Sequence, residues 1–384
     1  MFTMHIDKDY IIRIRRELHQ VPEVGFDLPK SIAIIKRELD ALAIPYTEEI
    51  GKSCIIATLN EGVGVKTIAI RADIDALPMQ EETGLSFAST HPGKMHACGH
   101  DCHAAMLLGT AKALKEMASQ IQCCVKFIFQ SAEEILGGAK TICETGFMEQ
   151  VDSIIACHIK PDYPVGTIAL NRTCCHACSR GALMHLYGKS SHVARPHLGV
   201  DAIAMAMRVY DGIQLMRARE MDPIERLVIG VGAIHGGQTN NIICDHVEIN
   251  LSIRTQDTAL NEHIYQRITQ IAESVAADMG GSAKLETYKF SPALHNDLSV
   301  ADDIQAAAEK IIGAQNILEK PESMGAEDFA YYLQHKPGAI FDLGVGTQGA
   351  PVIPIHNGKM VVNEDGLTVA PQIFIQYILD QMEK

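Results

Sequence analysis

The chain lacks several features that membrane and nucleic-acid-binding proteins show. None of its apolar runs approaches the roughly 18 residues that a membrane-spanning helix needs. Residues 1–16 mix acidic and basic side chains and lack the apolar stretch of a secretory signal. No basic run or basic helix is present, and the net charge is −14. We therefore expect binding neither to nucleic acid nor to a membrane.

A disulfide framework is also missing. The chain has 11 cysteines, an odd number, and it contains two adjacent pairs, Cys123-Cys124 and Cys174-Cys175, that suit no regular set of bridges. Free thiols are the simpler interpretation and indicate a reducing compartment, so we expect a cytoplasmic protein. With 384 residues, 47% of them hydrophobic, the chain is long enough for two packed domains.

The order of helix and strand patterns predicts the fold class. In the first part of the chain they alternate, which favours an α/β domain with a mixed, mostly parallel sheet. Residues 181–290 instead follow the order β-α-β-β-α-β, which is that of ferredoxin-like domains. The strand expected at 246–254 alternates apolar and polar residues, so it has one covered face. We expect a catalytic domain at 1–178 and 292–384, interrupted by an inserted dimerisation or lid domain at 179–291.

Possible metal ligands are concentrated in residues 95–103, Met-His-Ala-Cys-Gly-His-Asp-Cys-His. Neutral imidazole, thiolate and carboxylate are the usual protein ligands of zinc-like ions. Cys98 and His100 are two residues apart, and Gly99 allows the backbone to bend so that both side chains converge. Such a pair alone is more often a chance occurrence, but two further histidines in the same stretch favour a metal site. Asp101 could orient a ligand imidazole from behind.

Further candidate ligands stand where predicted strands end. Glu133 and Glu134 follow a strand; adjacent acids there usually form only a solvated loop, but a metallohydrolase could use one as a ligand and one as a base. His158 ends another strand, and ligands of open α/β sheets collect at such ends. His356 lies in a loop that could also be an ordinary turn. Five candidates are one too many for a single tetrahedral zinc and enough for two ions: Cys98, His100, Glu134, His158 and His356.

Other positions give weaker signals. Asp73 and Asp75 close a predicted strand, and we expect them to form a turn or to orient a ligand, because five other ligands are available. In the inserted domain, His192 and Asn241 lie in loops, and Arg254 points from the polar face of a strand. A hydrogen-bonded loop and a solvated arginine are the simpler interpretation. The alternative is recognition of a carboxylate, for which a guanidinium group is well shaped.

Together these motifs resemble a family of metallo-amidohydrolases. It includes N-acyl-amino-acid hydrolases, hippurate hydrolases, indole-acetyl-amino-acid hydrolases and N-acetyldiaminopimelate deacetylase, within the clan of dinuclear aminoacylases and carboxypeptidases. The resemblance extends over nearly the whole chain, from residues 16–23 to His356 and Asn357. Its most specific part is the stretch His-Ala-Cys-Gly-His-Asp at 96–101, followed by Ala-Glu-Glu at 132–134.

The resemblance implies a reaction and a set of roles. The reaction is hydrolysis of the amide bond of an N-acyl amino acid, with two divalent ions per subunit: zinc or manganese, with nickel or cobalt also possible. Glu133 would be the general base, and His192 would stabilise the oxyanion, in its own subunit or in a partner. Asn241 and Arg254 would hold the substrate carboxylate. A homodimer through the inserted domain is implied. The implied metal ligands are Cys98, His100, Glu134, His158 and His356.

Other classes of function stay open on the sequence alone. A thiol hydrolase would use Cys98 or Cys102 as nucleophile and would survive removal of metal. A non-catalytic scaffold would use metal only to hold the loop, but closed structural sites rarely keep a spare acid such as Glu133. Within the favoured class, residues 158–168 resemble the N-acetyldiaminopimelate deacetylase of lysine biosynthesis. The residues after His356 lack the family's usual proline and arginine, which leaves the acyl group open.

Overall fold

The computed structural model describes residues 5–383, so the first four residues of the segment tested for a secretory signal lie outside it. The chain forms two compact units. The large unit comprises Met1–Cys175, His295–Glu322 and Glu327–Lys384, and the inserted unit comprises His176–Leu294 and Ser323–Ala326. The segment 323–326, which the sequence places with the catalytic domain, joins the inserted unit because the Ala177 amide donates to the Gly325 carbonyl at 2.8 Å.

An eight-stranded sheet forms the centre of the large unit. The order of strands across the sheet is β1 (Tyr46–Thr47), β2 (Ile55–Leu59), β4 (Cys124–Gln130), β3 (Thr67–Asp73), β5 (Ser153–Pro164), β14 (Gly338–Gly346), β6 (Ile168–Leu170) and β13 (Ile317–Glu319). The four central strands, β4, β3, β5 and β14, pair in parallel. The pairs β1–β2, β2–β4 and β14–β6 are antiparallel, and β6–β13 is parallel.

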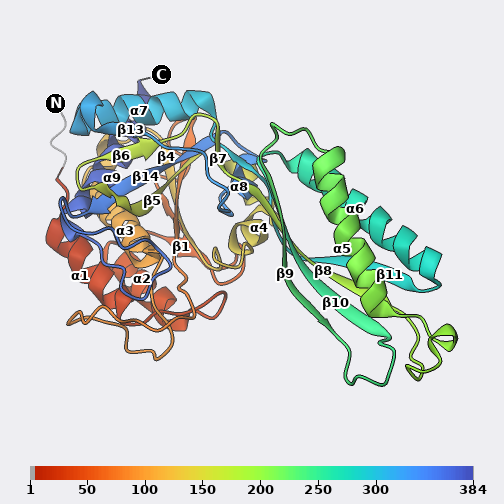
Figure 1. Cartoon of the computed structure of the whole chain (residues 1–384). Coiled ribbons are helices and arrows are strands. Elements are labelled where there is room, and N and C mark those ends of the chain that lie inside the picture. The colour runs from red at the N-terminus through yellow and green to blue at the C-terminus, as the bar shows by residue number, and fades with distance from the viewer. Residues whose placement is uncertain (1–4, 384) are drawn as a thin grey trace. The chain divides into compact units, whose positions relative to one another are not determined.

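Helices of the large unit pack on this sheet (Figure 1). Apolar residues of five helices share one core cluster with the strands, as Ile11, Ile14 and Leu18 do at helical spacing. These helices are α1 (Lys8–His19), α2 (Pro29–Ala41), α3 (His100–Glu116), α7 (Leu298–Ile312) and α9 (Val369–Met382). The remaining helical segments are short: α4 (Gly138–Cys143), α8 (Ala330–Leu333), η1 (Ala118–Gln120), η2 (Phe147–Gln150), η4 (Ala314–Asn316) and η5 (Glu364–Thr368).

The inserted unit has a four-stranded antiparallel sheet whose one face carries two helices (Figure 1). Val247, Ile249 and Leu251 of β10 are buried in the core with these helices, and the residues between them point to the other face. In chain order the elements are β8 (Cys178–Tyr187), η3 (Pro196–Leu198), α5 (Ala202–Arg219), β9 (Leu227–Gly236), β10 (His246–Thr255), α6 (Thr258–Met279) and β11 (Ser282–Ser291). Two short strands, β7 (Cys174–His176) and β12 (Leu294–His295), pair separately.

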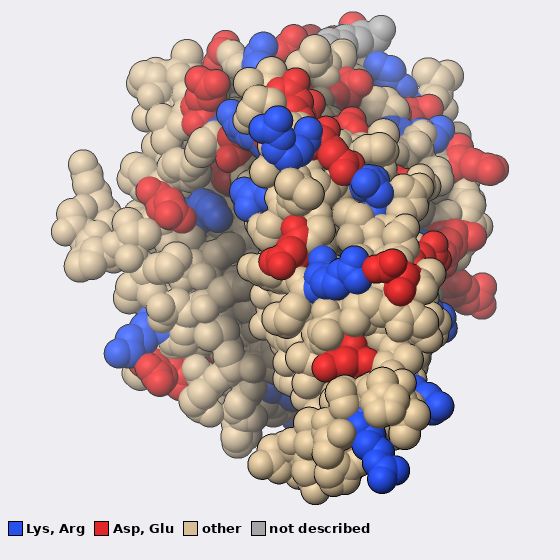
Figure 2. All heavy atoms as spheres, turned by 45° about the vertical axis from the view of Figure 1, so that its right-hand side comes forward, with Lys and Arg blue, Asp and Glu red and all other residues tan. Residues whose placement is uncertain are grey.

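The predicted fold class is confirmed: a mixed, mostly parallel α/β sheet and an inserted β-α-β-β-α-β unit. All 11 cysteines are free and buried. Among residues 5–383, no helix combines the length and apolar character needed to cross a bilayer. On the face drawn in Figure 2, basic and acidic side chains are interspersed rather than separated into areas of one sign.

Candidate metal centre

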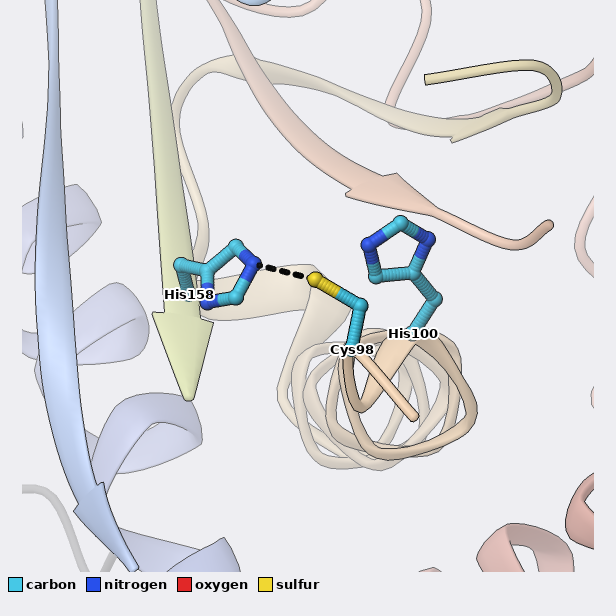
Figure 3. Close-up of side chains that lie close together, drawn as sticks. All are labelled: Cys98, His100 and His158. Carbon is cyan, nitrogen blue, oxygen red and sulfur yellow. Dashed lines mark hydrogen bonds between the residues drawn. The ribbon is translucent and has the colours of Figure 1, made fainter. Parts of the chain in front are cut away.

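The parallel strands bring distant residues to one edge of the large sheet. β3 ends at Asp73 and β4 ends at Gln130, and these two residues are register partners. β5, which lies beside β3, carries His158. Because parallel strands end at the same edge, the loops that follow them meet there, and α3 begins at His100 in the same region (Figure 3).

Cys98, His100 and His158 form the first part of the site. Figure 3 shows His158 and Cys98 pointing toward each other, and the His158 Nε2 to Cys98 Sγ distance is 3.4 Å. The Nδ1 of His158 donates to the Ile159 carbonyl at 2.7 Å, so its Nε2 keeps a lone pair directed at the thiol. His100 is fully buried, and neither ring nitrogen has a hydrogen-bond partner. An orphaned imidazole beside a thiol is the donor set that a zinc-like ion requires.

The acidic pair is held in a tight turn. Ala132 and Leu136 on either side of it have left-handed backbones, with φ of 56° and 57°. Such conformations cost about 1–3 kcal/mol each in residues other than glycine and are concentrated at functional sites. The carboxylate of Asp75 accepts hydrogen bonds from the amides of Glu133 at 3.0 Å and Glu134 at 3.2 Å. The turn therefore presents both acids at the sheet edge.

His356 reaches the site from a loop near the C-terminus. Its backbone is also left-handed, with φ of 61°, and its amide donates to the Ala97 carbonyl at 2.8 Å. That bond ties the loop to the residue before Cys98. The Nε2 of His356 lies 3.4 Å from Oε1 of Glu134, and the same oxygen lies 3.9 Å from Nε2 of His100.

The five predicted ligands thus come together in two overlapping groups. Ligand atoms of Cys98, His100 and His158 lie within 4.8 Å of one another, and so do those of Cys98, Glu134 and His356. Cys98 is common to both groups. Thiolate, imidazole and carboxylate donors of this kind fit two neighbouring divalent ions.

Two aspartates brace the imidazoles. The Oδ1 of Asp73 accepts from Nδ1 of His103 at 2.5 Å, and Nε2 of His103 accepts from the Ile159 amide at 2.9 Å. Both nitrogens of His103 are therefore engaged, which removes it as a ligand. The His100 ring lies between the two carboxylates, with Nδ1 3.4 Å from Oδ1 of Asp75 and Nε2 3.5 Å from Oδ2 of Asp73, and neither contact is a hydrogen bond.

Asp101 lies elsewhere than the sequence suggested. Its carboxylate Oδ2 is 2.9 Å from Nε of Arg15 and 2.7 Å from Nδ1 of His19. Both partners belong to α1. Asp101 thus links α1 to α3, and the carboxylates beside the His100 imidazole are those of Asp73 and Asp75.

A buried arginine behind the site was not singled out from the sequence. Arg71 donates to Asp73 at 2.8 Å, to Glu327 at 3.0 Å and to Asp328 at 2.9 Å. Burial, and then the negative charges of Glu327 and neighbouring acids, raise the pKa of Glu133 well above its usual value. A carboxylate in these surroundings accepts a proton readily. The family resemblance also covers residues 71–78 and 325–331, which contain Arg71 and Glu327, and this was their only signal in the sequence.

The three predicted substrate residues of the inserted unit do not meet within one chain. The Val193 amide donates to the Asn241 carbonyl at 3.0 Å, so His192 and Asn241 are neighbours. Arg254 donates to the Met324 carbonyl at 2.7 Å, near the other end of β10. Eight residues of extended strand separate His246 from Arg254, about 26 Å at 3.3 Å per residue. One chain cannot therefore place Asn241 and Arg254 on the same carboxylate.

The site combines a thiol, imidazoles and a carboxylate with a further buried acid, Glu133, at the carboxyl edge of an α/β sheet. This arrangement is that of a metallo-amidohydrolase. Residues 69–380 match the family described as Peptidase family M20/M25/M40, and the chain belongs to this family.

The curated relatives include deacetylases. An N-acetyl-L-cysteine deacetylase of Bacillus subtilis is 37% identical over 87% of this chain and 80% of its own length. An N-acetyldiaminopimelate deacetylase of Streptococcus uberis is 35% identical over 94% and 96%. Among solved structures, the Bacillus subtilis YXEP protein, a dinuclear metal-binding peptidase of family M20, has a TM-score of 0.84 at 31% identity and covers 98% of each chain.

Proposed function

We propose that this amidohydrolase cleaves the amide bond of N-acyl amino acids with two divalent ions bound at the candidate metal centre. The observation that carries the proposal is the sharing of Cys98 between two groups of ligand atoms, with Glu133 as a further acid beside them. Zinc is the ion that thiolate and imidazole donors favour by affinity, with manganese, nickel and cobalt as alternatives. Ligands for the two ions would be Cys98, His100, Glu134, His158 and His356.

The bound ions would polarise the amide carbonyl and lower the pKa of the attacking water. Glu133 takes up the proton of that water and returns it to the amide nitrogen as the bond breaks. Its burial, and its place beside Glu134 in a rigid turn, suit this transfer. Asp75 fixes the turn through two amides and also braces His100, so one carboxylate positions the base and a ligand together.

Substrate recognition is assigned to the inserted unit. Arg254 would hold the α-carboxylate, while His192, with Asn241 beside it, would stabilise the oxyanion, a contribution of about 3–4 kcal/mol where one such donor is removed. Since Arg254 is far along β10 from the other two, we assign His192 and Asn241 to the site of a partner subunit.

A homodimer through the inserted unit supplies that partner. β9 is an edge strand of its sheet, and its open edge could pair with another chain. Exposed apolar side chains lie on α5 and β9: Ile203, Met207, Tyr210 and Ile234. Such a combination is typical of an interface between copies of one chain.

The deacetylase relatives favour an acetyl group as the acyl part. N-acetyldiaminopimelate is the alternative specific substrate, which the S. uberis relative supports. The test is a hydrolysis panel of N-acetyl, N-benzoyl and indole-acetyl amino acids, N-acetylcysteine and N-acetyldiaminopimelate, with enzyme stripped by a chelator and reloaded with zinc or manganese. We expect activity to vanish on stripping and to return with metal, fastest on N-acetyl substrates. Unchanged activity after complete stripping would contradict the proposal.

The thiol-hydrolase alternative has less support. Cys98 and Cys102 are both buried, and burial raises the pKa of each thiol well above its usual value. A nucleophilic cysteine needs an accessible thiolate. The scaffold alternative would leave Glu133 without a use. It predicts bound metal without hydrolysis of any substrate in the panel.

A further inference from the structure

A second cluster of metal-ligating side chains lies in the inserted unit, on the sheet face away from the helices. In the antiparallel register, His185 of β8 is the partner of Glu248 of β10, and Tyr187 is the partner of His246. Cross-strand partners share a face, as do residues two apart on one strand. Val247 between the β10 residues is buried against the helices, so this cluster lies on the opposite face.

The spacing of the donor atoms is that of ligands on one ion. The Nδ1 of His185 lies 3.2 Å from Nε2 of His246 and 3.5 Å from Oε1 of Glu248. Around a tetrahedral zinc ion with bonds of about 2.0–2.1 Å, neighbouring ligand atoms are about 3.3–3.4 Å apart. The three residues can each offer one atom so that all three atoms lie within 4.8 Å of one another. Two imidazoles and a carboxylate therefore already stand at coordination spacing.

The three rings on this face lie nearly parallel. The His185 and His246 rings have centroids 5.5 Å apart and an interplanar angle of 8°, and with 3.2 Å between Nδ1 and Nε2 their nitrogen edges face each other in nearly one plane. The Tyr187 ring lies 5.0 Å from the His246 ring at an interplanar angle of 15°. All of these residues belong to paired strands, which fix where their side chains start. Binding one ion therefore needs a rotation of the two rings until their nitrogen lone pairs converge, without movement of the strands.

The surrounding charges are compatible with a cation. Lys284 of β11 is the other register partner of His185, but it forms an ion pair with Glu286. The same Glu286 carboxylate lies 4.0 Å from Nε2 of His185. The positive charge of Lys284 is thus offset by a neighbouring acid.

We propose that His185, His246 and Glu248 form a separate divalent-cation site that takes a zinc-like ion and links β8 to β10. Two nitrogen donors and one oxygen donor select zinc, nickel or copper over calcium or magnesium, which prefer oxygen ligands. Water would complete the coordination. The site is independent of the candidate metal centre, since the two share no residue.

The test is to count zinc on the full-length chain. Wild type and the variants His185→Ala and His246→Ala are stripped with a chelator, incubated with zinc, desalted and measured by elemental analysis. Each variant should hold about one zinc ion fewer per chain than wild type, because one ion needs all three ligands. His263→Ala removes an exposed histidine of α6 in the same unit and should match wild type. All of these chains keep the predicted ligands of the candidate metal centre. A difference in zinc content between them therefore reports on the second site alone and does not depend on the proposed function.

A conservative variant of Glu248 separates loss of a ligand from loss of zinc through misfolding. Glu248→Gln keeps the shape of the side chain and should weaken zinc binding at this site by at least about tenfold, measured by competition with a chromophoric chelator. Circular dichroism should be unchanged. Equal zinc content in wild type, His185→Ala and His246→Ala would overturn the proposal. The two histidines would then form only a hydrogen-bonded pair. Unchanged affinity in a folded Glu248→Gln would remove Glu248 from the site.

Discussion

Glu133 and Glu134 are adjacent acids for which we propose different roles. Glu133 is buried, and its burial and the charge of Glu327 raise its pKa, whereas Oε1 of Glu134 lies 3.4 Å from Nε2 of the predicted ligand His356. Glu133→Gln should therefore lower kcat by at least about a hundredfold, the lower bound for a lost general base, with metal content retained. Glu134→Gln should lose bound metal. Steady-state kinetics and elemental analysis on the same preparations separate the two roles, and full activity in Glu133→Gln would remove it from the mechanism.

The sequence could predict which residues gather at the site but not how each is oriented. Cys98, His100 and Glu134 follow strand ends or a glycine-containing loop, so their meeting at the sheet edge could be inferred from topology. Asp101 could not be placed, because the next residue on a helix is rotated by about 100° and faces another element. In the structure that element is α1, through Arg15. The roles of these residues stay predictions.

At the scale of elements, the position of Cys98 depends on the tight backbone at the start of α3. Gly99 has φ of 84°, and a Cβ there would lie 2.3 Å from Cγ1 of Ile159. Gly99→Ala should therefore destabilise the protein by more than the ~1 kcal/mol of backbone strain alone and displace Cys98 from the predicted ligand set. Gly84→Ala is the matched control, with φ of 72° and open space around the new Cβ. Denaturant titration and zinc content should show a larger loss in Gly99→Ala; equal losses would contradict the tight contact.

The contact between α1 and the loop at residues 81–89 should be sensitive to acid. Burial tends to raise the pKa of Glu81, but hydrogen bonds from His19, Thr83 and the Ser89 amide outweigh it and lower the pKa to about 2. Because the folded pKa is below the unfolded one, this stabilisation is present above about pH 4.5 and is lost as the pH falls toward 2.

Between pH 5 and 3 the free energy of unfolding of wild type should fall by up to about 2 kcal/mol through this group, and Glu81→Gln should lack this component. The measurement is urea unfolding of metal-free protein between pH 5 and 3. Glu82→Gln, at the exposed next residue, is the control and should titrate like wild type. If the free energy of unfolding of Glu81→Gln falls with pH as steeply as that of wild type, another group is responsible for the acid sensitivity.

Long elements could be predicted and short ones could not. Within the inserted unit the sequence predicts a helix over 258–279, which coincides with α6, and strands at 182–188, 227–235, 246–254 and 283–290, each of which lies within a few residues of β8, β9, β10 and β11. β6 and β13 have three residues each, too few to show an alternation of apolar and polar side chains. The sequence predicts one helix over 364–383, whereas the structure begins with the 3-10 segment η5, capped by Asn363, and becomes α-helical at Val369.

At the scale of the whole molecule, subunit complementation tests where His192 acts. Glu133→Gln and His192→Ala chains should each be nearly inactive alone. If His192 serves the partner's site, mixed dimers formed by unfolding and refolding the two together regain one competent site. Random mixing then gives about a quarter of wild-type activity per chain, since half of the dimers are mixed. No recovery would place His192 in the site of its own subunit.

The most direct test of the central claim is a crystal structure with zinc, using anomalous data at the zinc absorption edge. The account predicts two neighbouring peaks between β5 and the start of α3, with Cys98, His100, Glu134, His158 and His356 at ligand distances of about 2.0–2.3 Å. Glu133 should lie beside the ions without coordinating them. A zinc-saturated crystal with no anomalous peak among these five side chains would contradict the account.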